Sequence, residues 1–91
     1  MKFNIGELVV LAQRWHETGR TNEEFDKQFC GIYDSEEQFV EENYIPHTWP
    51  ELPERVLNHI DMSGLWRDLM TAGEFEAIYI DNDRVGVFTC H

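Results

Sequence analysis

The chain has 91 residues, of which 18 are Asp or Glu and 7 are Lys or Arg, so its formal net charge is −11. Phosphate contacts need clustered Lys and Arg, and the seven basic residues are scattered singly, so we expect no binding to nucleic acid. Six Phe, three Trp and three Tyr exclude a disordered acidic tail, because such tails lack the apolar residues that form a core. A chain of this length fits one domain, which buries only about 60–65% of the surface of the unfolded chain.

The N-terminal segment predicts a helix over residues 5–17, because its apolar residues recur at spacings of three and four. The expected buried stripe is Ile5, Leu8, Val9, Ala12 and Trp15. Gly19 follows and can adopt the left-handed conformation that ends many helices. The apolar run inside this segment covers only residues 8–12, with acids on both sides, which is too short for a signal peptide or a membrane span.

A second, short helix is expected to follow. Thr21 and Glu24 have the spacing of a capping box, in which the threonine side chain accepts the backbone N–H of the glutamate and the glutamate side chain accepts the backbone N–H of the threonine. Phe25 and Phe29 form an apolar pair four residues apart on this helix. The chain is then expected to break at residues 30–31, a cysteine followed by a glycine.

Residues 34–44, DSEEQFVEENY, place five carboxylates in eleven residues with no basic residue among them. The segment predicts a short amphipathic helix with Ser35 as N-cap and Gln38 completing a capping box, and Pro46 is expected to stop it. The apolar face holds Phe39, Val40, Asn43 and Tyr44. The opposite arc holds Glu37, Gln38, Glu41 and Glu42.

Residues 46–53 contain all three prolines and predict an ordered loop, with Trp49 as its expected anchor into the core. Pro53 suits the first position of a short helix. That helix carries Val56, Leu57 and Ile60. Asp61 is expected to cap the next helix and Gly73 to end it. Its apolar stripe is Met62, Leu65, Trp66, Leu69 and Met70.

After Gly73 the apolar period changes to two, which predicts strands over residues 75–81 and 84–90 joined by a turn at residues 81–83. A lone hairpin is marginal in water, so it must pack on helices or pair with further strands, from this chain or from another.

The expected fold class is therefore α+β, a small helical domain with a C-terminal antiparallel β-hairpin. A single domain covers residues 1–91, mainly helical over 1–72 and a hairpin over 73–91.

The sequence lacks the motifs of catalysis and metal binding. No HExxH, CxxC, GxSxG, P-loop or GxGxxG pattern occurs, and among 18 acids some carboxylates always lie close together without implying catalysis. The histidines, which fit surface or structural roles, are His16, His47, His59 and His91. Cys30 and Cys90 make neither a metal spacing nor a disulfide framework, so we interpret both as free thiols of a cytoplasmic protein. We expect no enzymatic activity, metal or cofactor.

The excess of acid has two interpretations. An acidic surface is most simply a solvated face, but rows of carboxylates on a rigid scaffold also imitate successive phosphates of DNA. On a regular helix Glu37 and Glu41 would lie about 6 Å apart along the axis and point the same way. The charge alone leaves both interpretations open.

Two segments of the sequence resemble the ArdA family of antirestriction proteins, which are DNA mimics carried by phages and mobile elements. The segments are FDKQFCGIYDSEEQFVEENY and IDMSGLWRDLMTAGEFEAIYIDNDRVGVFTCH. The matching features are GIYDSEEQFVEE at residues 31–42, an aromatic-rich helix running into Gly-Glu-Phe at residues 73–75, and the closing strand with its terminal histidine. The resemblance covers about two thirds of the chain, from Phe25 onward.

Members of that family carry an additional N-terminal domain and dimerise through the C-terminal part, so the resemblance implies a single-domain form here, as monomer or homodimer. Small phage anti-CRISPR proteins are similar in size and charge. Both comparisons imply an inhibitor in a bacterial host cell that competes with duplex DNA for the Lys- and Arg-rich groove of a defence machine. The target would be a type I restriction enzyme or a type I CRISPR surveillance complex. The candidate partner-binding carboxylates are Glu23, Glu24, Asp26, Asp34, Glu36, Glu37, Glu41, Glu42, Asp68, Glu74, Glu76, Asp81 and Asp83.

Two alternatives belong to other classes. One is a helical protein-interaction adaptor that binds through an apolar patch around Trp49 and Trp66. The other is a salt-adapted protein with no partner, whose stability rises with salt.

Overall fold

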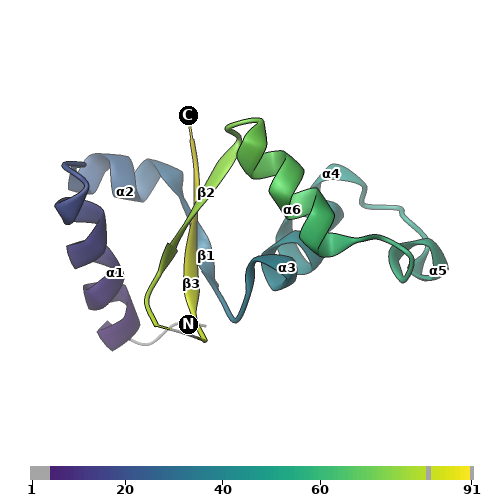
Figure 1. Ribbon diagram of the computed structural model, residues 1–91, viewed down its shortest axis with the longest axis horizontal. Helices are drawn as coiled ribbons and strands as arrows, with labels where there is room; N and C mark the ends of the chain where they lie inside the picture. The colour runs from purple at the N-terminus through teal and green to yellow at the C-terminus, as the bar shows by residue number, and fades with distance from the viewer. Residues whose placement is uncertain (1–4, 82, 91) are drawn as a thin grey trace.

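A three-stranded antiparallel sheet lies at the centre of the computed structural model, which describes residues 5–81 and 83–90. The strand order is β1-β3-β2, with β1 at Phe29–Tyr33, β2 at Phe75–Tyr79 and β3 at Val85–Thr89. The helical elements are α1 (Ile5–Glu17), α2 (Asn22–Gln28), α3 (Glu36–Phe39), the π-helix η1 (Val40–Tyr44), α4 (Ile45–Thr48), α5 (Glu54–Leu57) and α6 (Met62–Thr71). The fold is α+β, and its C-terminal strands β2 and β3 form the expected antiparallel hairpin (Figure 1).

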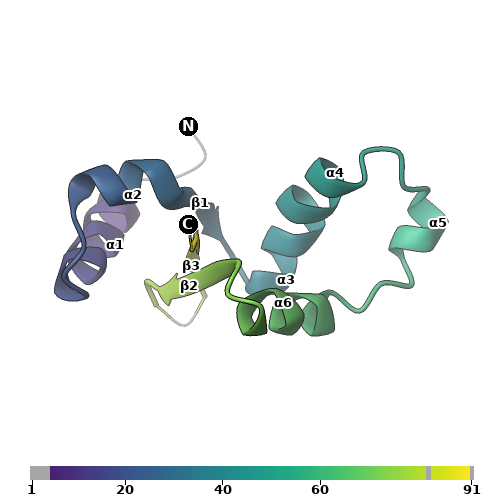
Figure 2. The same cartoon turned by 90° about the horizontal axis from the view of Figure 1, so that it is seen from above.

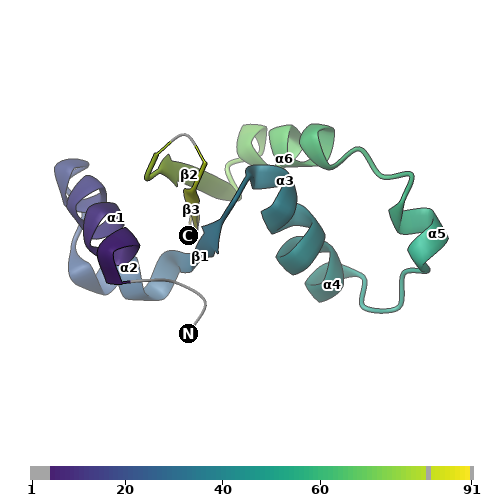
Figure 3. The same ribbon diagram turned by 90° about the horizontal axis from the view of Figure 1, so that it is seen from below.

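Helices cover both faces of the sheet, with α1 and α2 on one side and α3, α4 and α6 on the other (Figures 2 and 3). Each side has its own hydrophobic core. The α1-side core contains Leu11, Trp15, Ile32, Ile80 and Phe88. The α6-side core contains Phe39, Val40, Ile45, Trp66, Leu69 and Val87. Neighbouring residues of β3, Val87 and Phe88, belong to opposite cores because successive side chains of a strand point to opposite faces.

Strand β1 was not expected, since the sequence predicted a break at residues 30–31. The strand pairs with β3, and its register shifts between Phe29 and Gly31. Because of this irregularity, Phe29 and Ile32, three residues apart, both pack in the α1-side core. Gly31 has φ 145°, which is available to glycine and strained for other residues. The shift hides the two-residue period that identifies a strand in a sequence.

Helix α1 has the expected bounds, but the predicted buried stripe was only partly right. Trp15 is buried as predicted and Leu8 and Ala12 are half-buried, whereas Leu11 was not in the predicted stripe. Leu11 and Trp15 are fully buried, whereas Ile5 is 72% exposed and Val9 is 50% exposed. Residues 8–12 are all apolar, so they present apolar side chains around most of the helix, and the contact with the sheet selects which face is buried. Trp15 lies at the centre of this contact, because its ring stacks on Phe88 with the ring centroids 4.3 Å apart.

The acidic helix over residues 36–48 is longer than predicted, because Pro46 does not stop it. Ser35 accepts the backbone N–H of Gln38 at 3.1 Å, as expected of the N-cap, while the Gln38 side chain binds the amide of Asp34 and not that of Ser35. From Val40 the chain adopts π geometry, in which Ile45 donates to the carbonyl five residues earlier. The wider π turn accommodates the proline, which has no N–H and whose ring would clash in a regular α-helix.

The proline-rich loop does not insert Trp49 into the core, since this side chain is 46% exposed. Pro53 is the N-cap of α5 and not its first residue. Helix α6 matches its prediction more closely. Asp61 caps it by accepting the amide of Gly64 at 3.0 Å, and Trp66 and Leu69 are buried.

The hairpin turn is described on both sides of Asn82, which lies outside the described residues. Asp81 accepts the backbone N–H of Asp83 at 2.8 Å, and Ile80 donates to the carbonyl of Arg84 at 3.0 Å. The hairpin does not stand alone, because its third strand and its covering helices all come from this chain.

Candidate protein-interaction surface

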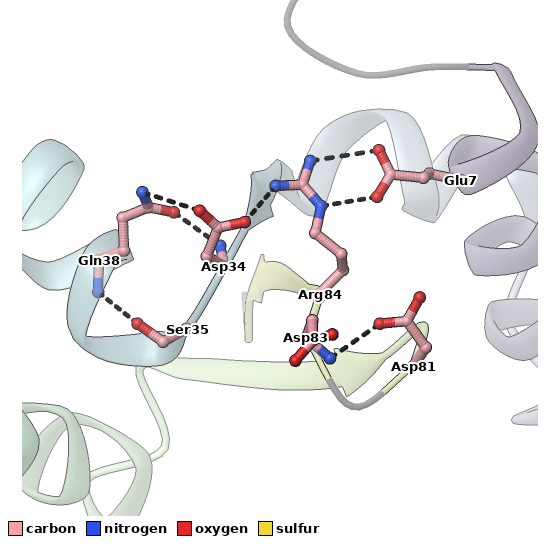
Figure 4. Close-up of polar contacts among 7 residues, drawn as sticks. All are labelled: Glu7, Asp34, Ser35, Gln38, Asp81, Asp83 and Arg84. Atoms are coloured by element: carbon pink, nitrogen blue, oxygen red, sulfur yellow. Dashed lines mark hydrogen bonds and ion pairs between the residues drawn. The ribbon is translucent and has the colours of Figure 1, made fainter.

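Arg84 joins three segments of the chain at one end of the sheet. The pairing of Tyr33 with Val85 places Asp34, the next residue after β1, opposite Arg84, the residue before β3. The guanidinium donates from Nη1 to Asp34 at 2.6 Å, and from Nε and Nη2 to the two carboxylate oxygens of Glu7 at 2.6 and 3.2 Å (Figure 4). These hydrogen bonds, first with Glu7 and then with Asp34, raise the pKa of Arg84. The cation is therefore retained at any pH at which the protein folds.

Arg20, between α1 and α2, forms an ion pair at the other end of the sheet. Both of its terminal nitrogens donate to the carboxylate of Glu76 on β2. Its guanidinium carbon lies 4.5 Å from the ring centroid of Trp15, a cation–π arrangement. The hydrogen bond with Glu76 raises the pKa of Arg20, and Glu24 adds a smaller electrostatic contribution. Arg20 thus lies within the field of carboxylates from both α2 and β2.

The structure distributes the predicted carboxylates among several elements. Five of them have partners in the fold. Glu24 completes the capping box with Thr21, Asp34 and Glu76 bind the arginines, Glu36 accepts from the hydroxyl of Tyr79, and Asp81 accepts from the turn amide. Within residues 5–81 and 83–90, the predicted carboxylates without a side-chain hydrogen bond or ion pair are Glu23, Asp26, Glu37, Glu41, Glu42, Asp68, Glu74 and Asp83. All eight are exposed.

The C-terminal group of predicted carboxylates does not form one continuous row; it consists of Asp68, Glu74, Glu76, Asp81 and Asp83. Glu74 and Glu76 lie at the start of β2, while Asp81 and Asp83 lie beyond its end, so the two pairs are at opposite ends of the strand. Instead, Asp81 and Asp83 share the end of the sheet with Asp34, and Figure 4 shows all three around Arg84 at the hairpin turn. The structure therefore collects acids at the two ends of the sheet and along the helices.

Regular helix spacing also does not apply to the pair Glu37 and Glu41. The π geometry begins at Val40, between them, so the 100° rotation per residue is interrupted. Both carboxylates remain exposed, as does Glu42.

Several residues of this surface were missed by the sequence analysis. Glu7 and Arg84 are 77 residues apart, and Arg20 and Glu76 are 56 apart, so no spacing rule connects them. The available signal was the excess of 18 acids over seven basic residues, which does not single out Arg20 and Arg84, the two arginines that form ion pairs among the described residues. Further exposed acids outside the predicted set are Glu17, Glu51, Glu54 and Asp61.

The molecule measures 40 × 26 × 22 Å along its principal axes. A duplex of the same length carries about 12 phosphates per strand, since successive phosphates of a strand advance about 3.4 Å along the axis. The net charge of −11 is therefore close to that of one DNA strand over 40 Å, and about half that of the duplex.

A second surface feature is apolar. An open groove of about 390 Å³ is lined by Thr48, Trp49, Pro50, Glu51, Leu52 and Pro53. It belongs to the loop that connects α4 with α5, at the end of the molecule farthest from α1 (Figure 2). Trp66 is only 7% exposed and lies in the α6-side core, so the apolar patch predicted around Trp49 and Trp66 contains only the first of these residues.

The remaining candidate groups are the thiols. Cys30 and Cys90 are free, and burial raises the pKa of both thiols. In the described part of the chain, no three His, Cys, Asp or Glu side chains are placed to hold a metal ion, and no helix is long and apolar enough to cross a membrane.

No family model matches the chain, and neither a curated protein nor a solved structure matches it.

Proposed function

We propose that this protein is an acidic DNA mimic that inhibits a host anti-phage machine. It competes with duplex DNA for a groove lined by Lys and Arg, in a type I restriction enzyme or a type I CRISPR surveillance complex. The observation that carries this proposal is the match between a charge of −11 over 40 Å and the charge of one DNA strand of that length.

The free carboxylates are the groups that engage the target. Glu37, Glu41 and Glu42 are exposed on a helix whose other face is anchored in the α6-side core by Phe39 and Val40, so the scaffold holds them in place. A carboxylate without an internal partner loses no ion pair when it meets a lysine or arginine of the target. Rigid placement lowers the entropy cost of that contact.

The paired carboxylates have a different role. Arg84 and Arg20 each neutralise acids drawn from distant segments and so reduce self-repulsion in a chain of this charge. Because an arginine neutralises each of them, Asp34 and Glu76 add little to the negative charge that a target would meet.

The mechanism is occupancy and requires no catalysis, metal or cofactor. Opposite fields accelerate the encounter of the decoy with a basic groove, and salt screens both the encounter and the complex. The protein would act in the cytoplasm of the bacterial host, where the defence machine meets DNA, and would bind no nucleic acid itself.

A competition assay tests the proposal. Labelled target duplex is bound to purified type I restriction enzyme or type I CRISPR surveillance complex, and the protein is titrated at low and at high salt. We expect displacement of the duplex that weakens as the salt concentration rises. Absence of displacement from both machines at low salt would contradict the proposal.

The second candidate is the interaction adaptor, which one observation favours: Trp49 is exposed beside an open apolar groove. An adaptor that binds through Trp49 alone would lose its partner on truncation of this side chain and would depend little on salt. The salt series of the competition assay therefore separates the two candidates.

A further inference from the structure

We propose that the groove formed by residues 48–53 is a second contact of the decoy, which receives an apolar side chain projecting from the Lys- and Arg-rich surface of the target. This inference rests on the proposed function and adds a determinant of partner choice to it. Charge alone would direct the protein to any basic DNA-binding groove. An apolar groove beside the acids would let this protein distinguish one DNA-binding target from another.

The groove is held in shape before binding. Trp49 donates its backbone N–H to the carbonyl of Ile45 at 2.7 Å, and Leu52 donates to the carbonyl of Trp49 at 3.2 Å, which closes a four-residue turn. Pro50 occupies the second position of this turn, where its fixed φ is favoured, and Pro53 is the N-cap of the next helix, α5. Because these restraints already limit the conformations of the loop in the free protein, the loop loses little further conformational entropy on binding.

Trp49 is both anchored and accessible. Its ring makes an edge contact with Tyr44, whose own ring contacts Phe75 of the sheet. Nearly half of the side chain nevertheless faces solvent at the edge of the groove. A partly exposed tryptophan on a rigid loop is the kind of residue that contributes most to protein–protein affinity.

The charge around the groove specifies the chemistry of the occupant. Between residues 41 and 61 the chain carries one arginine, Arg55. The carboxylates of the same stretch, all exposed, are Glu41, Glu42, Glu51, Glu54 and Asp61. Of these carboxylates, Glu51 lines the groove and Glu54 directly follows its last residue in the chain. An apolar groove with carboxylates beside it is complementary to an aliphatic or aromatic side chain flanked by lysines or arginines. A basic groove that binds DNA offers this combination wherever an apolar side chain lies among its cations.

The first test compares Trp49→Ala with wild type in the competition assay, using the same two purified machines as probes. Met70→Ala is the matched control, because Met70 is 48% exposed on α6 and does not line the groove. We expect Trp49→Ala to need at least about tenfold more protein for half-displacement, with an unchanged dependence on salt. Met70→Ala should behave as wild type.

The second test needs no substitution and so does not depend on a variant that folds. The protein is produced with 5-hydroxytryptophan, whose emission can be excited apart from that of the tryptophans of the target. Trp15 and Trp66 are buried, so the neutral quencher acrylamide reaches mainly residue 49. Adding the machine should protect this emission from quenching, and unchanged quenching in the complex would show that the groove stays open.

The outcomes separate the two proposals. If carboxylate variants weaken displacement while Trp49→Ala matches wild type and quenching is unchanged, the groove is not a contact and the DNA-mimic function stands. If the wild-type protein displaces duplex from neither machine at low salt, the proposed function fails and this inference fails with it.

Discussion

Arg84 forms a bidentate ion pair with Glu7, a residue 77 positions earlier in the chain, with donor–acceptor distances of 2.6 and 3.2 Å. Both side chains are largely shielded from solvent, and the remaining nitrogen of the guanidinium binds Asp34. The contact connects the start of α1 to the hairpin and to the entry of the acidic helix. It is therefore a tether between α1 and the rest of the fold.

Arg84→Ala should lower the free energy of unfolding by about 1–3 kcal/mol, because it removes three charge-assisted hydrogen bonds, two to Glu7 and one to Asp34. Urea denaturation measures the change. The control is Arg67→Ala on α6, an exposed arginine whose removal should change stability by less than about 0.5 kcal/mol. Equal effects of the two substitutions would mean that the tether adds nothing to stability.

Gly86→Ala should destabilise the protein by about 1–3 kcal/mol through overpacking. A Cβ added at this buried position in β3 would approach the side-chain carbons of Leu11 to 2.5 and 2.6 Å. Leu11→Ala alone should cost roughly 2–5 kcal/mol because it leaves a cavity. Since each change relieves the other, the double variant measured by urea denaturation should cost less than the sum, whereas simple additivity would count against this contact.

Stability should fall as the pH rises into the alkaline range. Burial raises the pKa of the Cys30 thiol and of the Tyr33 hydroxyl, so both groups lose their protons more readily in the unfolded chain. Their contribution is fully present below the ordinary pKa of a thiol, about 8.5, and is lost as the pH climbs through the raised value. Urea denaturation between about pH 7 and about pH 10 should show this decline, and Cys30→Ala should make it shallower. An identical slope in the variant would assign the decline to other groups.

Glu37→Gln combined with Glu41→Gln should weaken displacement of duplex by about tenfold and should reduce the dependence on salt by roughly one unit of slope per lost contact. Both side chains are exposed and make no hydrogen bond or ion pair among the described residues, so circular dichroism should report an intact fold. The matched control is Gln13→Lys with Asn58→Lys, which changes the net charge by the same amount at exposed positions and keeps every carboxylate. If the control weakens displacement equally, total charge and not these two positions determines binding.

Features that depend on neighbours in the sequence were predicted correctly. The bounds of α1, the capping box of Thr21 and Glu24, the Asp61 cap of α6 and the C-terminal hairpin all follow from side chains a few residues apart. Helix periodicity and cap hydrogen bonds act over one or two turns, which is why the sequence alone carries this information. The acidity of the surface could also be predicted from the sequence, because burying an unpaired carboxylate is costly wherever it occurs.

Features that depend on distant contacts were decided only in the tertiary structure. The face of α1 that is buried follows from the packing of Leu11 on Gly86, and β1 is a strand because β3 pairs with it despite its shifted register. The sequence by itself determined α1, α2 and α6, the caps at Thr21, Ser35 and Asp61, the hairpin and the excess of acid. The fold decided which carboxylates are neutralised, because the partners of Arg20 and Arg84 lie fifty or more residues away and meet them only when the sheet closes between its two layers of helices.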